Sequence, residues 1–256
     1  MTKTRTVSLT AIILTFNNER LLPACLESVQ WADEIIIYDS GSTDNTHTIA
    51  GQYNATVIID NEWSGFGVQR QKAQQQATSD WLLWVDSDEV VSVALRQSIE
   101  CALVAPEAQN VYSINRLSDF FGKPIRHSGW YPDRIVRLHS REHYRYNDAI
   151  VHEKIDCPTA SVLPLAGDLL HYTTDSFLGY MSKSLRYAND WAQASYAKGR
   201  RVSVLGITMR TLFAFVRKFI IKKGFLDGRH GFLLAMQSSH YTFNKYFALW
   251  SLQQKK

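Results

Sequence analysis

Four continuous apolar runs, separated by helix-type patterns, occupy the first 90 residues of the chain. The runs are short and rich in β-branched residues or, at 81–86, in tryptophan and leucine, which is typical of buried strands. Because the runs are apolar throughout rather than at alternate positions, both faces of each strand should be buried. The pattern predicts an α/β fold, with a mostly parallel sheet covered by helices on both faces. The expected strands are 7–16, 34–39, 55–60 and 81–86.

Apolar residues at helical spacing fill the gaps between these runs. The expected helices cover 18–30, 44–53, 67–78 and 93–104, and Asp44 is a candidate N-cap of the second helix. Strands and helices that alternate in this way are the hallmark of a sheet whose parallel strands are joined by crossover helices.

The pattern changes after residue 110. Residues 110–129 fit a strand, a loop and a returning strand, 134–139 fit another strand, and 176–198 fit a helix. We therefore expect an α/β domain over 1–175 and a C-terminal helical, basic extension over 176–256.

Charge is distributed unevenly along the chain, although the net charge is only +4. Residues 198–256 hold 12 Lys and Arg against one acid, Asp227, which gives +11, and residues 1–197 carry −7. A strongly basic segment attracts an anionic partner, which here is membrane lipid, nucleic acid or a phosphorylated substrate.

The central run of the basic segment, residues 204–224, is apolar but is interrupted by five Lys and Arg. These charges make it a poor membrane-spanning helix. Its apolar residues share one helical face, which predicts a basic amphipathic helix lying in a membrane interface. The alternative is a helix that packs against the core and exposes its basic face to water.

The N-terminal stretch 1–16 places basic residues before an apolar run, as a signal peptide does. This run is short, and Asn17 follows it without a small-residue cleavage site, so a buried first strand is the favoured interpretation. The three cysteines, Cys25, Cys101 and Cys157, are odd in number and widely spaced. They favour a reducing compartment over a disulfide framework.

Polar residues follow three of the expected strands at the point where each strand ends. These are TFNNE at 15–19, YDSGSTDNT at 38–46 and DSDE at 86–89. Each set alone is ordinary turn and helix-cap chemistry. Ligands of an open parallel sheet bind beyond the carboxyl ends of its strands, so three such ends together predict a ligand site.

Asp86 and Asp88 would point to the same side if the chain stayed extended. Two carboxylates so placed repel one another unless a cation lies close, and hard oxygen ligands suit Mg²⁺ or Mn²⁺ bridging to a diphosphate. The alternative is a solvated acidic turn that complements the dipole of the following helix.

These three motifs, at these separations, resemble family 2 glycosyltransferases with the GT-A fold, over residues 7 to about 175. Four further stretches resemble bacterial β-1,4-glucosyltransferases of lipopolysaccharide inner-core assembly. These stretches are 62–73, 129–139, 151–153 and 222–232.

The resemblance implies a site for a UDP-sugar. Asp39 would accept a hydrogen bond from the uracil, Asp86 would hold ribose or metal-bound water, and Asp88 would bind Mg²⁺ or Mn²⁺. Arg70 or Lys72 would lie against the diphosphate. The other expected members of the donor pocket are Thr15, Asn17, Glu19 and Ser42.

Inverting transfer needs a base that takes the proton of the acceptor hydroxyl. The paired acids found in many family members are absent, and the nearest match is His152 with Glu153. We expect Glu153 to be the base, with Asp133 next and Asp148 as a further rival. His171 is implied as a second metal ligand. Aromatic residues that would stack on sugar, or equally pack in a core, are Trp63, Trp130 and Tyr131.

The sequence therefore predicts an inverting, metal-dependent transfer of a hexose, glucose from UDP-glucose in the first instance, to a lipid-linked phosphorylated saccharide. The expected acceptor is the heptose region of lipopolysaccharide, at the cytoplasmic face of the inner membrane. Alternatives are a transferase for another envelope glycan or glycolipid, and a non-catalytic nucleic-acid-binding protein. No nucleic acid is expected as partner, because binding through the basic tail leaves the acids at three strand ends unexplained.

Overall fold

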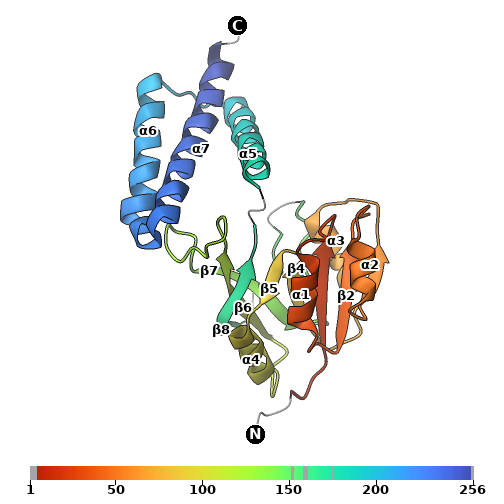
Figure 1. The fold of residues 1–256 in the computed structure, drawn as a ribbon. Helices are drawn as coiled ribbons and strands as arrows, with labels where there is room; N and C mark the ends of the chain where they lie inside the picture. The colour runs from red at the N-terminus through yellow and green to blue at the C-terminus, as the bar shows by residue number, and fades with distance from the viewer. Residues whose placement is uncertain (1–4, 151–152, 158–160, 174–175, 255–256) are drawn as a thin grey trace. The chain divides into compact units, whose positions relative to one another are not determined.

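The computed structural model places the chain in two compact units (Figure 1). We call them the sheet unit and the helical unit. The sheet unit comprises Met1–Arg116 and Asp133–His171, and the helical unit comprises Leu117–Pro132 and Tyr172–Lys256. Within these units the structure describes residues 5–150, 153–157, 161–173 and 176–254.

One eight-stranded sheet forms the centre of the sheet unit, in the order β3-β2-β1-β4-β7-β6-β8-β5. The four strands expected from the apolar runs are present, lie side by side and are mutually parallel. Their register places Thr15 beside Asp39 and Leu14 beside Asp86, so the polar strand ends meet at one edge. The strands are β1 (Leu9–Thr15), β2 (Glu34–Asp39), β3 (Thr56–Ile59) and β4 (Trp81–Asp86).

The other half of the sheet is antiparallel where its pairing is defined. It contains β5 (Glu89–Val91), β6 (Asn110–Ser118), β7 (Asp133–Ser140) and β8 (Ser161–His171). The expectation of a returning strand within 110–129 is wrong. The antiparallel partner that follows β6 in the chain is β7, which begins at Asp133. After β6, Phe121 and Gly122 take positive φ angles, and one isolated bridge is all that continues the pairing.

Side chains of successive strand residues enter cores on opposite faces of the sheet. Leu9, Ala11 and Ile13 belong to one buried cluster, whereas Ile12 and Trp84 belong to the other. The continuous apolar runs therefore mark strands covered on both faces, as predicted.

Four helices accompany these strands: α1 (Leu22–Val29), α2 (Thr46–Gly51), α3 (Phe66–Gln74) and α4 (Val93–Ala102). The expected N-cap role of Asp44 is wrong, because Asn45 occupies that position. The Asp44 carboxylate instead accepts hydrogen bonds from the backbone N–H groups of Thr46 and Glu19, which ties α2 to the loop after β1.

The helical unit is built from α5 (Phe177–Ala197), α6 (Val204–Val216) and α7 (Gly228–Gln254). A π-helical turn and a 3₁₀ turn, Arg217–Ile221 and Gly224–Asp227, join α6 to α7. Within the described residues, no helix is long and apolar enough to cross a membrane.

Asp227 fixes the loop 117–132 to this helical unit. Its buried carboxylate accepts hydrogen bonds from the backbone N–H groups of Arg126 and His127, about 100 residues away in the chain. The 3₁₀ turn and the start of α7 approach one another so closely that only glycine fits at position 231. A Cβ there would lie 1.8 Å from the carbonyl oxygen of Gly224. The motif KKGFLDGRHGF therefore places Asp227 against the loop 117–132, and we call this set of contacts the Asp227 clamp.

Candidate active site

The loop after β2 wraps around Asp39, whose side chain is fully buried. Its carboxylate accepts hydrogen bonds from the N–H groups of Gly41 (2.8 Å) and Ser42 (2.6 Å) and from the Ser42 hydroxyl. A carboxylate offers about four acceptor positions. The expected role of Asp39 toward a uracil N–H is therefore compatible with this loop, although most of the acceptor capacity is already used.

The loops after β1 and β2 bind one another through the residues expected in the donor pocket. Asn17 donates its backbone N–H to Ser42 Oγ (2.7 Å), and its side-chain oxygen accepts from Thr43. Glu19 accepts from Asn45. These residues thus fix the two loops against one another. Thr15 Oγ1 is buried and has no hydrogen-bond partner among the described residues.

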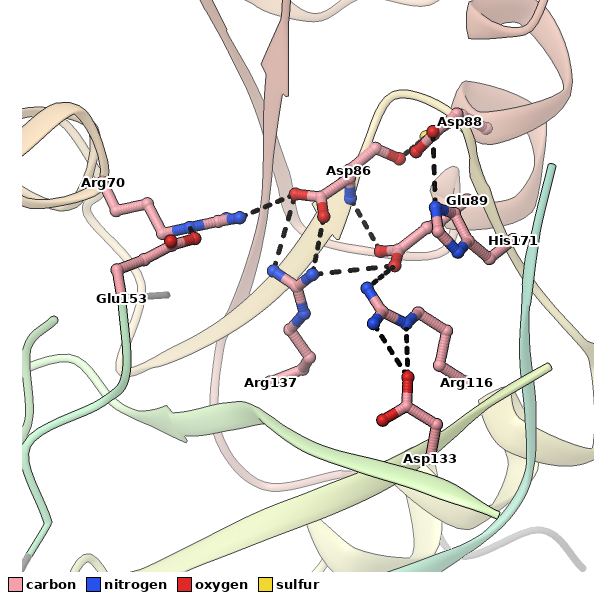
Figure 2. A network of polar contacts seen from close by, with 10 residues as sticks. Arg70, Asp86, Asp88, Glu89, Arg116, Asp133, Arg137, Glu153 and His171 are labelled. Carbon is pink, nitrogen blue, oxygen red and sulfur yellow. Dashed lines mark hydrogen bonds and ion pairs between the residues drawn. The ribbon is translucent and has the colours of Figure 1, made fainter. Parts of the chain in front are cut away.

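Asp86 ends β4 and is held by two arginines (Figure 2). Arg70 Nη2 lies 2.8 Å from Oδ1, and Arg137 Nη2 lies 2.6 Å from Oδ2. Burial alone would raise the pKa of Asp86, but Arg137 and Arg70 outweigh it and hold the pKa well below its usual range. The Asp86 carboxylate is therefore ionised and lies between two guanidinium groups.

Asp88 does not share the direction of Asp86, so the expectation of two parallel carboxylates is wrong. The extended conformation ends at Asp86, and Ser87 and Asp88 form a turn before β5. Asp88 Oδ2 instead lies 3.4 Å from His171 Nε2 (Figure 2). The two expected metal ligands are thus together at the end of β8.

This pair fits a divalent cation. One carboxylate and one imidazole are donors that Mn²⁺ accepts, and Mg²⁺ or Mn²⁺ commonly takes one or two protein ligands and completes its shell with substrate phosphate and water. Among the described residues, no cluster of three His, Cys, Asp or Glu could hold the ion by itself. The geometry suits an ion shared with a bound diphosphate.

Glu89 and Arg137 are functional candidates that sequence reasoning left unassigned. Glu89 is fully buried, and its Oε2 accepts from the backbone N–H of Asp86 (2.9 Å). Its Oε1 lies 3.6 Å from Arg137, and its Cα is paired with that of His171. Burial raises the pKa of Glu89 to about 7, with Asp86 adding to the rise and Arg137 opposing it. The sequence signal was its position beside Asp88.

Arg116 extends this network to Asp133. The Arg116 guanidinium lies 2.8 Å from the Asp133 carboxylate and 3.9 Å from Glu89. Asp133, the second candidate base, is about 40% exposed and so can meet an acceptor from solvent. A chain of alternating charges thus runs from Asp133 to Asp86.

Arg70 joins two expected site residues. Its Nε donates to Glu153 Oε1 (3.0 Å), while its Nη2 holds Asp86. Trp84 and Tyr146 lie on the same side of it, at 5.4 and 5.0 Å from ring centroid to guanidinium carbon, with 5.1 Å between the two ring centroids. Only Nη1 has no hydrogen-bond partner among the described residues. The arginine is buried against these two rings and is held in one orientation by its two carboxylate partners.

The remaining candidates lie in different environments. Lys72 pairs with Asp60 (2.7 Å), and Asp148 accepts from Gln71, whereas His152 lies outside the described residues. Trp63 is half-exposed and packs edge-on against Phe66. The other two aromatic candidates, Trp130 and Tyr131, belong to the helical unit.

Comparison with known proteins now adds to this geometry. Residues 10–159, more than half of the chain, match the profile of glycosyl transferase family 2. The chain belongs to glycosyl transferase family 2. The matched region contains the parallel strands and every carboxylate of the network described above. Of the two expected metal ligands, Asp88 lies inside this region and His171 lies beyond its end.

Two relatives of this family 2 transferase match along almost its whole length. An uncharacterised glycosyltransferase of Rickettsia conorii is 26% identical over 269 residues, which is 99% of this chain and 93% of the relative. The lipopolysaccharide core biosynthesis glycosyltransferase LpsC of Rhizobium meliloti is 28% identical over 241 residues, covering 92% and 89%.

Among solved structures, a mannosyltransferase from Pyrobaculum calidifontis in complex with GDP-Man and Mn²⁺ aligns with a TM-score of 0.52. The alignment covers 92% of the family 2 chain and 74% of the mannosyltransferase, at 13% identity. The likeness confirms the expected GT-A fold, and the enzyme class expected from the sequence, a glycosyltransferase, is confirmed by the family.

Proposed function

We propose that this family 2 enzyme is an inverting, metal-dependent hexosyltransferase. Its expected donor is UDP-glucose, and its expected acceptor is a lipid-linked phosphorylated saccharide in the heptose region of the lipopolysaccharide core. The observation that carries the proposal is the Asp88–His171 pair beside the Asp86 network, at the carboxyl ends of parallel strands. The name of the relative LpsC supports the acceptor class.

Asp88 and His171 would hold the Mg²⁺ or Mn²⁺, which would offset the charge that develops on the leaving diphosphate. The presence of Mn²⁺ with the similarly folded mannosyltransferase supports this choice. Arg70 and Arg137 fix Asp86 in its charged form, so that it can accept hydrogen bonds from ribose hydroxyls. Because these partners are preset, little reorganisation is needed when the donor binds.

Glu153 remains the proposed base, with Asp133 as its rival. The ion pair with Arg70 holds the Glu153 carboxylate in one orientation and leaves one oxygen, Oε2, for an acceptor hydroxyl. The same guanidinium touches Asp86. Arg70 would thereby place the donor-binding carboxylate and the base in a common frame, which is the kind of positioning that transfer requires.

The surface of the helical unit supports a peripheral position on the cytoplasmic face of the inner membrane. This unit contains 16 Lys and Arg but four Asp and no Glu, a net charge of +12. Exposed apolar side chains recur along α6, among them Leu205, Met209 and Leu212. Basic charge and exposed apolar surface together favour binding to an anionic leaflet.

Calorimetric titration with UDP tests the nucleotide and metal part of the proposal. We expect binding that requires Mn²⁺ or Mg²⁺ and that is lost in Asp88→Asn. The matched control is Glu100→Gln, which removes an exposed carboxylate of the same unit and should bind as the wild type does. UDP binding that is indifferent to metal and to Asp88 would refute the metal-dependent mechanism. A screen of nucleotide sugars against core saccharides then tests donor and acceptor.

A further inference from the structure

The helical unit contains a half-open cavity of about 570 Å³ that the proposed transfer does not use. The start of α7, the start of α5 and the loop between β6 and β7 surround it. Its apolar walls are formed by Phe120, Phe121, Phe177, Leu233 and Met236. The polar groups at its wall are His230, Gln237 and His240.

One wall of this cavity, at Phe120, is fixed by packing. Phe120 is buried, lies 4.9 Å from Phe121 between ring centroids and 5.8 Å from Tyr180, and packs in a cluster with Leu234. The Asp119 carboxylate accepts from the N–H of Gly122, which closes the loop. This wall is therefore preformed, as the walls of binding sites for small apolar groups usually are, whereas Phe177, Leu233 and Met236 present exposed apolar surface beside it.

The cavity opens onto an apolar stripe along α7. Leu233 and Met236 line the cavity and are also exposed, and Phe243 and Phe247 continue the same face at helical spacing. Leu234, Ala235 and Leu249 point to the opposite, buried side. Water in an apolar cavity makes few hydrogen bonds, so an apolar ligand can displace it readily. An exposed apolar face of this kind marks an interaction site.

Basic residues adjoin the cavity walls in the chain. Lys123 lies two residues after Phe121 in the same loop, and the exposed Arg229 directly precedes His230. The Lys123 ammonium donates to the carbonyl oxygen of Asp227 (2.7 Å), which places it at the start of α7. An apolar cavity at the start of α7, with these cations in the neighbouring turn and loop, complements an amphiphile with an anionic head group. The net charge of +12 opposes the alternative, a second copy of the same unit.

We propose that this cavity binds one fatty acyl chain of an anionic membrane phospholipid, with the head-group phosphate near Lys123 and Arg229. The α7 stripe would lie on the leaflet from which that chain is drawn. The inference rests on the membrane association proposed above and deepens it, because it adds a stoichiometric lipid site to a diffuse surface.

The test uses the full chain and lysophosphatidylglycerol with 10-, 12- or 14-carbon chains, below the critical micelle concentration. Calorimetry should give one site per chain, with affinity rising by about fourfold for each added methylene. Met236→Trp fills the cavity and should weaken binding at least tenfold. Leu163→Trp adds the same ring at an exposed position of β8, in the sheet unit, and should leave binding unchanged. Leu233→Trp is a second filling variant, and thermal unfolding confirms that each variant folds.

Binding that is absent, that is independent of chain length, or that stays at the wild-type level in both filling variants would overturn the cavity proposal. Lysophosphatidylcholine of equal chain length should bind more weakly, because it lacks the net negative charge. Vesicle sedimentation and UDP titration run on the same samples. If the protein binds vesicles and UDP but no monomeric lipid, only the cavity proposal is refuted. If it binds the lipid but no UDP, only the proposed transferase mechanism is refuted.

Discussion

The two units of this transferase use similar apolar residues in opposite ways. Of the large apolar side chains that are exposed in the described residues, eight belong to the sheet unit and 21 to the helical unit. The sheet unit carries a net charge of −8 and the helical unit +12. Apolar residues in the sheet unit are thus mainly buried in its two cores, whereas many in the helical unit are exposed and can contact a partner.

The units also differ in how they accommodate cations. In the sheet unit, the buried Arg70 and Arg137 are neutralised by Asp86, Glu89 and Glu153, even though Arg70 also lies over the rings of Trp84 and Tyr146. In the helical unit, cations lie over aromatic rings, as Lys245 does over Trp191, Arg210 over Tyr246 and Lys218 over Trp130. Ring faces stabilise a cation without cancelling its charge. The helical unit therefore keeps its positive potential, and the sheet unit does not.

Removal of the proposed base should have the largest effect, and it should be confined to the chemistry of the sheet unit. Glu153→Gln is expected to lower kcat by about 10²–10⁴-fold, because general base catalysis contributes that much, with vesicle binding unchanged. Steady-state kinetics measure the loss. Glu142→Gln, an exposed carboxylate of the same unit, is the control. If Asp133→Asn shows the large loss and Glu153→Gln does not, the base is Asp133.

Breaking the buried charge network should cost stability rather than rate alone. Arg137→Met leaves Asp86 and Glu89 with less compensation in a buried site, and we expect about 3–5 kcal/mol of lost unfolding free energy. Denaturant unfolding measures it. Arg96→Met, which breaks an exposed pair with Glu100 on α4, should cost about 0.3–0.5 kcal/mol. Equal losses in the two variants would contradict the distinction drawn between buried and exposed pairs.

Loss of surface charge from the helical unit should weaken membrane binding without affecting nucleotide binding. Each Lys or Arg near an anionic surface is worth about 1 kcal/mol, so Arg217→Gln with Lys222→Gln should lower the affinity for phosphatidylglycerol vesicles about 30-fold at low salt. Sedimentation measures the affinity. The control Arg20→Gln removes a cation from the sheet unit. A similar fall in that control would show that net charge alone governs binding.

The smallest effect concerns an ion pair at the edge of the sheet unit. Lys72 lowers the pKa of Asp60 to about 2, with the Tyr38 hydroxyl as the next cause. Because the folded pKa is depressed, this stability is present above about pH 4 and is lost as the pH falls toward 2. Lys72→Met should cost about 0.2–1 kcal/mol at pH 7 and progressively less below pH 4. Unfolding at pH 7, 4 and 2.5 tests this, and a constant difference would exclude the ion pair as its cause.

The sequence was sufficient for the parallel half of the sheet, because apolar runs and helical spacing are local signals. The strand order beyond β4 and the grouping of loop 117–132 were not predictable in this way. They depend on contacts distant in the chain, such as Asp227 with Arg126. In the same way, the pattern of α7 indicates an apolar face but not whether protein, lipid or solvent covers it.

The site was predicted in part for the same reason. Asp88 and His171 were expected to bind one ion, and the structure places them 3.4 Å apart, Asp88 in the turn after β4 and His171 at the end of β8. The parallel orientation of Asp86 and Asp88 failed because a turn begins at Ser87. Glu89 and Arg137 could not be assigned, because their importance comes from burial beside Asp86, which no local pattern encodes.

The Asp227 clamp bears on how this protein can be engineered. The backbone passes between the units three times, after Arg116, after Pro132 and after His171, and the segment between the first two passages depends on a carboxylate about 100 residues later in the chain. A stop codon placed before α6 would therefore remove the anchor of loop 117–132 as well as the basic helices. Point substitutions on helix surfaces, rather than truncations, are the tools that can separate catalysis from membrane attachment.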